Sequence, residues 1–161
     1  MIFKNEVTVG DILTLLGLLV ASMALFFTWL SMRRGNRQAR AQFLIDLYNQ
    51  YKSDADLISI YYEIEYGQFA YDGSFHTSEK EKKLDKLLGY FDNIAKLWRM
   101  GNITLDDVQI VAYEIIVLYQ DSAVKEYLAF LDEWFAERGI KLRPYGAFRD
   151  LGAALQKHFY V

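Results

Sequence analysis

Carboxylates and histidines are the side chains of this sequence that could carry acid–base or metal chemistry, but their spacing does not bring them together. Glu63 and Glu65 stand two residues apart within Tyr61–Tyr66. On a helix they would point about 200° apart, so they cannot act together without other elements. We interpret them as solvated surface carboxylates. His76 and His158 lack the Glu-x-x-His pairing by which helical bundles hold metals, and we expect both to be exposed rather than catalytic.

The other common sources of chemistry are missing from the sequence. It contains no cysteine, which excludes a disulfide framework, a thiolate zinc site and a cysteine nucleophile. It has no phosphate-cradling glycine loop, no His-Glu-x-x-His and no Gly-x-Ser-x-Gly. We therefore predict no catalytic residue, no metal site and no cofactor. A deep pocket in which Glu63, Asp92 or Glu114 converge would reopen the question of an enzyme.

Twelve tyrosines follow the arginines at residues 33–40 and could form a stacking surface for a ligand. Most of them fall on apolar stripes of expected helices. A tyrosine there buries its ring and leaves its hydroxyl at the rim. We therefore expect most of them to pack in a core.

The hydrophobicity of the chain is concentrated near its N-terminus. Between Asp11 and Arg33 lie 21 consecutive uncharged residues, 12–32. As a helix they span about 31 Å, close to the roughly 30 Å hydrocarbon core of a bilayer. A soluble core helix of this length would carry a polar face, and a cleaved signal peptide has a shorter apolar region, about 7–15 residues, behind a basic segment. The sequence therefore predicts an uncleaved transmembrane helix at 12–32, in contact with the lipid bilayer.

The charges that flank this stretch predict its orientation. Its N-terminal flank holds Lys4 against Glu6 and Asp11, whereas its C-terminal flank holds four arginines: Arg33, Arg34, Arg37 and Arg40. By the positive-inside rule, residues 1–11 are a short extracytoplasmic segment and the remainder is cytoplasmic, in the cell inner membrane. Trp29 lies one turn before the arginines, where an interfacial aromatic anchor belongs. We expect Trp29 and the four arginines to anchor the helix at the interface.

Small residues form a stripe along the same helix. They recur at alternating spacings of four and three, a period of 3.5, and the stripe comprises Gly10, Thr14, Gly17, Ala21, Ala24, Thr28 and Ser31, with Gly35 continuing it. In lipid, helices associate by close backbone approach over small residues, and this period is that of a left-handed crossing. The stripe predicts a homo-oligomer or a partner membrane helix.

The rest of the chain has the pattern of amphipathic helices. A basic juxtamembrane segment and helix is expected at 33–52, prolonging the membrane helix after an interruption at Gly35 and Asn36. A cytoplasmic helical domain follows at 53–161. Its apolar stripes, capping signatures at Ser78 with Glu81 and at Thr104 with Asp107, and closing glycines predict helices at about 54–66, 78–100, 104–119, 121–138 and after Pro144.

The fold class that follows is all-α: one N-terminal transmembrane helix and an antiparallel bundle of about five to six helices. Within residues 67–77, Asp72-Gly73 predicts a turn that could form a tiny hairpin, the one plausible strand. Residues 41–161 hold 13 basic and 19 acidic side chains, a net charge of −6. An acidic body does not favour nucleic acid, so we predict no nucleic-acid partner.

One stretch of the sequence resembles a known family. The residues Lys86–Trp98, then Gly101-Asn-Ile and the Thr104 helix, stand behind an N-terminal anchor and an Arg-Gln-Ala-Arg-Ala entry at 37–41. In this the chain resembles a bacterial family of small membrane-anchored helical proteins catalogued as domain of unknown function 4760, over about residues 12–137. The resemblance implies no activity and lends no catalytic residue.

Three functions are compatible with these observations. The leading hypothesis is a non-enzymatic, membrane-tethered interaction or sensing module that binds a protein partner or responds to a state of the bilayer. The second is a small membrane-perturbing effector, of toxin or antiphage type, assembled through the small-residue stripe. The third, an enzyme at the membrane surface, has the least support because the sequence offers no evident base or nucleophile.

Overall fold

The structure, a computed structural model, describes residues 9–159 of the chain, and for residues 9, 11–13, 33, 34, 36 and 37 it describes the backbone alone. Most of the segment expected outside the membrane, residues 1–11, therefore lies outside the described residues. The chain divides into two compact units, Met1–Phe43 and Leu44–Val161. We describe each unit by itself.

The first unit consists of the greater part of one long helix, α1 (Val9–Ser53). Among the described residues, its stretch Thr14–Met32 is the one long and apolar enough to cross a membrane, and none of that stretch is buried. The expected apolar N-terminal helix is thus confirmed. The interruption expected at Gly35 and Asn36 is absent: α1 continues through both, since one glycine costs a helix only about 1 kcal/mol.

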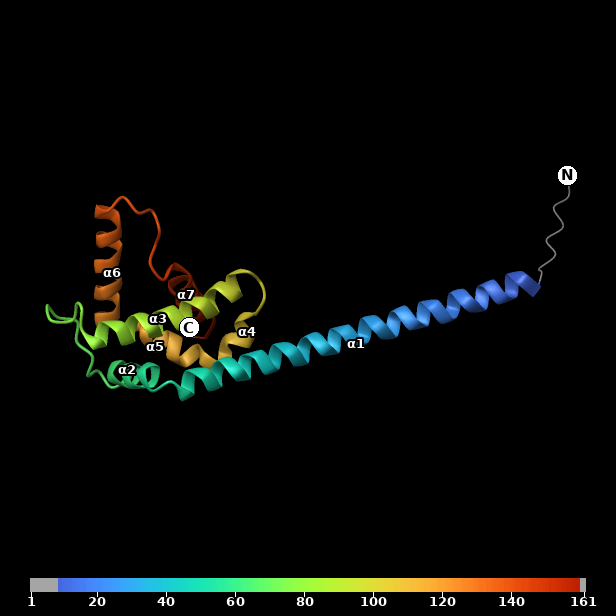
Figure 1. Cartoon of the computed structure of the whole chain (residues 1–161), viewed down its shortest axis with the longest axis horizontal. Helices are drawn as coiled ribbons and strands as arrows, with labels where there is room; N and C mark the ends of the chain where they lie inside the picture. Colours follow the sequence, from blue (N-terminus) through green and yellow to red (C-terminus); the bar gives the residue numbers. More distant parts are fainter. Residues whose placement is uncertain (1–8, 160–161) are drawn as a thin grey trace. The chain divides into compact units, whose positions relative to one another are not determined.

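The second unit contains the end of α1 and the remaining helices (Figure 1). Within residues 9–159 the chain forms seven α-helices, one 3₁₀ turn and no strand, which confirms the all-α class. The elements after α1 are α2 (Ala55–Glu65), α3 (Glu79–Arg99), α4 (Leu105–Val108), the 3₁₀ turn η1 (Gln109–Val111), α5 (Ala112–Gln120), α6 (Ser122–Glu137) and α7 (Gly146–Phe159).

Side-chain caps start these helices where the sequence predicted. The Ser78 hydroxyl accepts from the Glu81 amide at the start of α3. At the start of α4, Thr104 and Asp107 form the reciprocal capping box. Each of these caps satisfies amides that the first turn of a helix leaves without an intrahelical partner.

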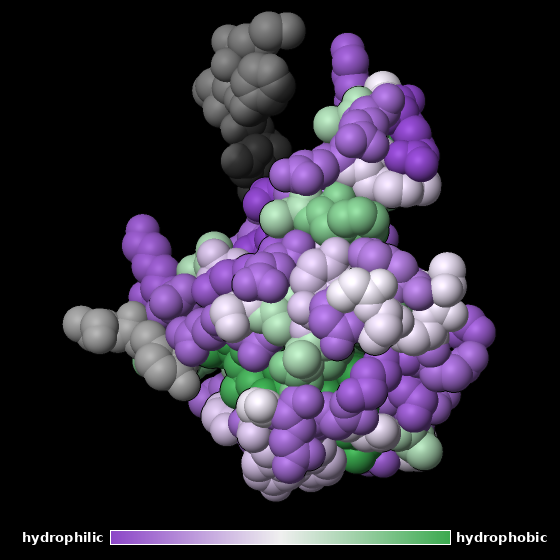
Figure 2. All heavy atoms as spheres, turned by 90° about the vertical axis from the view of Figure 1, so that its left-hand side faces the viewer, coloured by the Kyte–Doolittle hydropathy of each residue, from purple (hydrophilic) through white to green (hydrophobic). Residues whose placement is uncertain are grey.

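Four helices form a closed ring around the core of the second unit. α2 packs on α3, α3 on α7, α7 on α5 and α5 on α2, which confirms the helical bundle. Their buried side chains are almost all apolar, and several of the largest are fully buried: Phe91, Phe148, Ile60, Leu84, Leu87, Ile115 and Leu151. The face of the molecule in Figure 2 is mostly hydrophilic, with hydrophobic residues recessed between polar ones.

The last turns of α1 belong to this core. Tyr51 is fully buried, and the Lys52 ammonium lies 3.3 Å from the Glu114 carboxylate of α5. The Tyr90 hydroxyl of α3 donates to the Leu47 carbonyl, and burial raises the pKa of Tyr90 to about 12. The second unit therefore begins inside α1 rather than after it.

Two local expectations are wrong. The possible hairpin at 67–77 is an irregular loop without strands, because Asp72 folds it locally: its carboxylate accepts from the Ser74 amide (2.8 Å) and hydroxyl (2.6 Å). The loop is held by Phe69 and Phe75, both buried and packed edge to face. Aromatic burial thus takes the place of strand pairing.

The helix expected over 104–119 is broken into α4, η1 and α5. Val108 and Val111 are both buried, whereas Gln109 and Ile110 between them are exposed. In a 3₁₀ turn, residues three apart lie on one side, so the tighter turn directs both valines into the core. The backbone then restarts as α5 after Val111, at φ −128° and ψ 13°.

A glycine allows α5 and α7 to pack closely. A β-carbon added to Gly152 of α7 would lie 2.6 Å from the ring and 2.9 Å from the β-carbon of Tyr119 in α5. Because the base of a side chain cannot swing away, either a helix or the tyrosine would have to shift. By contrast, a β-carbon at Gly89 of α3 would meet nothing within 4 Å.

We therefore expect Gly152→Ala to lower the free energy of unfolding by about 1–3 kcal/mol through overpacking. Gly89→Ala is the matched control and is expected to raise it by about 0.5–1 kcal/mol, because alanine restricts the unfolded chain and favours the helix. Thermal unfolding of the full chain in mild detergent, followed by circular dichroism, measures both. Equal melting temperatures for Gly152→Ala and the parent would contradict the close approach.

Candidate functional site

A cleft opens between α6 and the four-helix ring. α6 is buried through Val124, Tyr127 and Leu128 in its first half, while Trp134 in its second half is exposed. The second half bounds a hollow of about 680 Å³ against α3 and the segment that precedes α7. We call it the α3–α6 cleft; its lining residues are His76, Thr77, Glu81, Asp85, Asp92, Tyr127, Phe130, Leu131, Trp134, Phe135, Pro144 and Tyr145.

One face of α3 supplies the carboxylates of the cleft. Glu81, Asp85 and Asp92, with Leu88 between the last two, follow spacings of four, three and four, which place them in one row along the helix. Leu88 is fully buried and Asp92 is 6% exposed, so the row borders the core. Carboxylates that are buried or half-buried need hydrogen-bond donors, and each of these has at least one donor from outside α3.

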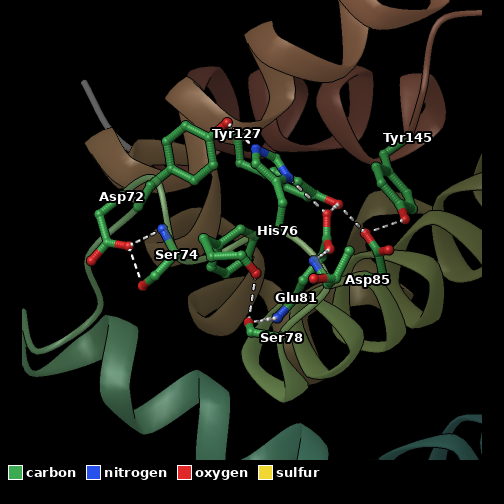
Figure 3. A network of polar contacts seen from close by, with 11 residues as sticks. Asp72, Ser74, His76, Ser78, Glu81, Asp85, Tyr127 and Tyr145 are labelled. Atoms are coloured by element: carbon green, nitrogen blue, oxygen red, sulfur yellow. Dashed lines mark hydrogen bonds and ion pairs between the residues drawn. The ribbon is translucent and has the colours of Figure 1, made fainter.

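Glu81 binds the loop that precedes α3 (Figure 3). Its Oε2 accepts from the Thr77 amide (2.5 Å), and its Oε1 lies 3.1 Å from Nδ1 of His76. Burial alone would raise the pKa of Glu81, but the bonds from Thr77 and His76 outweigh it and hold the pKa below its usual value. Thr77 is a β-branched residue at φ 65°, a conformation that the Glu81 bond helps to keep.

Asp85 binds two tyrosines from two different helical regions (Figure 3). The Tyr127 hydroxyl of α6 donates to its Oδ1 at 2.6 Å, and the Tyr145 hydroxyl, just before α7, donates to the same oxygen at 2.9 Å. Burial, together with Asp85, raises the pKa of both tyrosines above the usual value, so both remain neutral donors.

Asp92 caps α7 from outside that helix. Its Oδ1 accepts from the Phe148 amide in the first turn of α7 (2.9 Å), and its Oδ2 lies 2.9 Å from the Lys96 ammonium. Tyr145, which precedes α7, is in the left-handed region at φ 50°. The Asp92 carboxylate of α3 thus accepts a hydrogen bond from a first-turn amide of α7, as the N-cap side chains do for α3 and α4.

A carboxylate–imidazole–hydroxyl chain joins Glu81 and His76 of the cleft lining to Tyr71 outside that lining, and its chemistry does not favour nucleophilic catalysis. The Tyr71 hydroxyl lies 2.9 Å from Nε2 of His76, whose Nδ1 faces Glu81. A nucleophile of this kind needs a hydroxyl that loses its proton readily. Burial raises the pKa of Tyr71, and the negative charge of Glu81 raises it further. These hydrogen-bond partners instead orient His76, whose ring lies against Phe130 at a centroid distance of 4.2 Å and an interplanar angle of 39°.

Of the histidines and acidic residues that the sequence analysis named, some line the cleft and others lie elsewhere in the domain. His76, expected to be exposed, is half-buried in the cleft wall, whereas His158 is exposed near the end of α7. Of the three acids named as a possible pocket, Asp92 lines the cleft. Glu63 pairs with Lys80 (2.7 Å) and Glu114 pairs with Lys52, both away from the cleft lining.

The tyrosines also divide. Tyr51, Tyr61 and Tyr127 are buried in the core as expected, and Tyr127 also borders the cleft, together with the half-buried Tyr145. The part of the chain that the structure describes contains no group of three metal-ligating side chains.

The small-residue stripe and the interface residues lie in the first unit. All seven stripe residues are exposed, as are Trp29 and Arg40; the side chains of Arg33, Arg34 and Arg37 lie outside the described residues. The hydroxyls of Thr14, Ser22 and Thr28 each donate to the carbonyl four residues earlier, at 2.8 Å. These hydroxyls are therefore satisfied within the helix, as a lipid environment requires.

Comparison with known proteins gives no match: no protein-family model, no curated protein and no solved structure is significantly similar to this chain. The resemblance to the family of domain of unknown function 4760 therefore stays a prediction. Functional inference rests on the cleft and on α1.

The hydrogen bonds to Glu81 make a pH-dependent contribution to stability. Its pKa is lower in the folded state than in the unfolded chain, so the contribution is present above the unfolded value and is lost as the pH falls through the folded value. We expect Glu81→Gln to cost about 1–3 kcal/mol of unfolding free energy at pH 7 and less below pH ~4.

Glu79→Gln is the matched control, because Glu79 is an exposed carboxylate in the same helical turn and pairs with the exposed Lys82. It is expected to change stability by less than about 0.5 kcal/mol at either pH. Denaturation of the full chain in detergent, repeated at both pH values, gives the comparison. A cost for Glu81→Gln that is independent of pH would contradict an ionised, hydrogen-bonded Glu81.

Proposed function

We propose that this chain is a single-pass protein of the cell inner membrane whose helical domain is a cytoplasmic binding or sensing module, with the α3–α6 cleft as its binding site. The observation that carries the proposal is the cleft: a hollow of about 680 Å³ with aromatic and acidic walls, beside an otherwise close-packed core. Cavities of about 300–1,000 Å³ with apolar walls and a few placed polar groups are typical ligand sites.

The anchor is supported by the surface of Thr14–Met32. Apart from the half-buried Leu30, its large apolar side chains are exposed over half or more of their area; Leu18 is 64% and Leu25 72% exposed. Leaving such area in water costs about 25 cal/mol per Å², and a bilayer removes the cost. The self-satisfied hydroxyls of Thr14, Ser22 and Thr28 fit the same environment.

A binding module is favoured over an enzyme because the polar groups of the cleft are already engaged as hydrogen-bond partners of one another. Glu81 accepts from the Thr77 amide, and Asp85 accepts from two neutral tyrosines. Such groups can orient and select a ligand without transferring a proton to it. A protein partner that inserts a side chain into the cleft would use the same groups.

The orientation can be tested because the chain has no cysteine of its own. We expect Ser74→Cys, in the domain, to be labelled by a membrane-impermeant maleimide only after the cells are permeabilised. Asn5→Cys, in the N-terminal segment, should be labelled in intact cells. Labelling of Ser74→Cys in intact cells would reverse the proposed topology, and recovery of both variants in the soluble fraction would refute the anchor.

Self-association through the small-residue stripe is part of the proposal. We expect Gly17→Leu and Ala21→Leu each to shift the full chain towards monomer in native lipid, because a leucine keeps the backbones apart. Ser22→Leu is the control, since Ser22 lies on the same helix about 100° from Ala21 and off the stripe. Single-molecule photobleaching counts the subunits; a monomer, or equal effects of all three changes, would contradict the stripe.

The same variants test the alternative function, a membrane-perturbing effector. The small-residue stripe is the observation that favours this alternative. An effector assembled through the stripe should depolarise the membrane when the chain is expressed, and Gly17→Leu should abolish this effect. A binding module should leave the membrane potential unchanged in both forms.

A further inference from the structure

We propose that the ligand of the α3–α6 cleft is an organic ammonium ion with an apolar body, bound by the Asp85 carboxylate and the aromatic walls. This inference rests on the proposed function of the cleft and adds the chemical class of the ligand. It is argued from the charge, the surface and the size of the cleft.

The charge of the cleft is complementary to a cation. Among the described residues that line it, three are carboxylates and none is lysine or arginine. Asp92 is paired with Lys96, and Glu81 is bonded to His76. Asp85 differs from both: within the described part of the chain, its hydrogen-bond donors are the neutral hydroxyls of Tyr127 and Tyr145, both on Oδ1.

Asp85 is therefore a carboxylate without a compensating cation, and its second oxygen, Oδ2, accepts no hydrogen bond among the described residues (Figure 3). An ammonium group in the cleft would supply both the missing charge and the missing donor. An anionic ligand would meet three carboxylates, and His76 is the one basic side chain among the described residues of the lining, so phosphates and carboxylates are disfavoured.

The aromatic walls favour the same class of ligand. Tyr127, Phe130, Trp134 and Tyr145 line one hollow, and aromatic faces attract cations through their quadrupole. One face of the Trp134 ring is already covered by Arg138, whose guanidinium carbon lies 3.7 Å from the ring centroid, so a ligand cation would have to use another part of the aromatic wall or replace this contact. Arg138 is itself outside the lining of the cleft.

The size and the remaining walls favour an organic cation over a metal ion. A hollow of about 680 Å³ is far larger than one ion, and Leu131, Phe135 and Pro144 add apolar surface to it. The described residues offer no group of three metal ligands. An apolar body that fills the hollow would add burial at about 25 cal/mol per Å² to the attraction of the charge.

Three probes of one shape and different charge test the proposal: 4-phenylbutylamine, a cation at pH 7, neutral 4-phenylbutanol, and anionic 4-phenylbutyrate. Each is titrated calorimetrically into the full chain in nanodiscs of zwitterionic lipid, with empty nanodiscs subtracted. We expect the amine to bind at least about tenfold more tightly than the alcohol, and the butyrate to bind most weakly.

Asp85→Asn is the decisive variant, because asparagine keeps an acceptor for Tyr127 and Tyr145 but removes the charge. It is expected to weaken binding of the amine at least about tenfold and to leave the alcohol unchanged. Trp134→Leu, at a position that is 37% exposed and outside the buried core, is a second variant and should weaken the amine about three- to tenfold. Glu79→Gln, outside the cleft, should leave every affinity unchanged.

The outcomes separate this inference from the proposed function. Equal binding of amine and alcohol, tighter binding of the butyrate, or an unchanged amine affinity in Asp85→Asn overturns the ammonium ligand. If the alcohol or the butyrate binds and Trp134→Leu weakens it, the cleft still stands as a binding site. If no probe binds, the ammonium inference fails, while the anchor and orientation are decided independently by cysteine labelling.

Discussion

The second unit depends on one row of carboxylates along α3. Glu81, Asp85 and Asp92 border the core, where a carboxylate without donors would cost several kcal/mol, so each draws donors from a separate segment. Glu81 fixes the loop before α3, Asp85 fixes α6 through Tyr127, and Asp92 fixes the first turn of α7. Hydrophobic burial makes the four helices of the ring pack together, but it is not directional. The carboxylates supply the direction, because each is satisfied only when the neighbouring element is in its place.

The sequence predicted the helices well where one local signal decides the outcome. Ser78, Thr104 and Asp121 mark helix starts because the cap lies within three residues of the amide that it satisfies. The prediction from the sequence was wrong where burial in the tertiary structure determines the backbone. Burial of Val108 and Val111 converts part of a predicted α-helix into a 3₁₀ turn. Similarly, burial of two phenylalanines removes the need for a hairpin in the loop before α3. Local sequence patterns cannot predict these two structures, because both depend on which side of the segment faces the core.

The cleft was visible in the sequence only in part. The spacing of Glu81, Asp85 and Asp92 places them on one face of a predicted helix, and a capping signature accounts for Glu81, but no local pattern indicates what Asp85 and Asp92 bind. Their partners stand 42–60 residues away in sequence, as with Tyr127 and Tyr145 on Asp85. Tyrosines on an amphipathic stripe look alike whether they end in a core or at its edge. Whether a tyrosine of α6 lies in the core or at its edge depends on how α6 packs against the ring, and only half of the length of α6 does so.

An apolar hollow persists in a folded domain only if its walls cannot approach each other. The outer wall, α6, is fixed at two points: Tyr127 is bonded to Asp85, and one turn further Asp132 receives both guanidinium Nη atoms of Arg149 from α7 (2.6 and 3.1 Å). Arg149 also donates to the Leu128 carbonyl, so it joins α7 to α6 through three hydrogen bonds. Beyond this clamp, Trp134 and Phe135 extend over the cleft without a facing helix to pack on. Collapse of the hollow would break bonds to ionised groups, which are the stronger kind. A ligand that fills the cleft therefore gains burial without reorganising its walls, and preorganisation of this sort turns buried area into affinity.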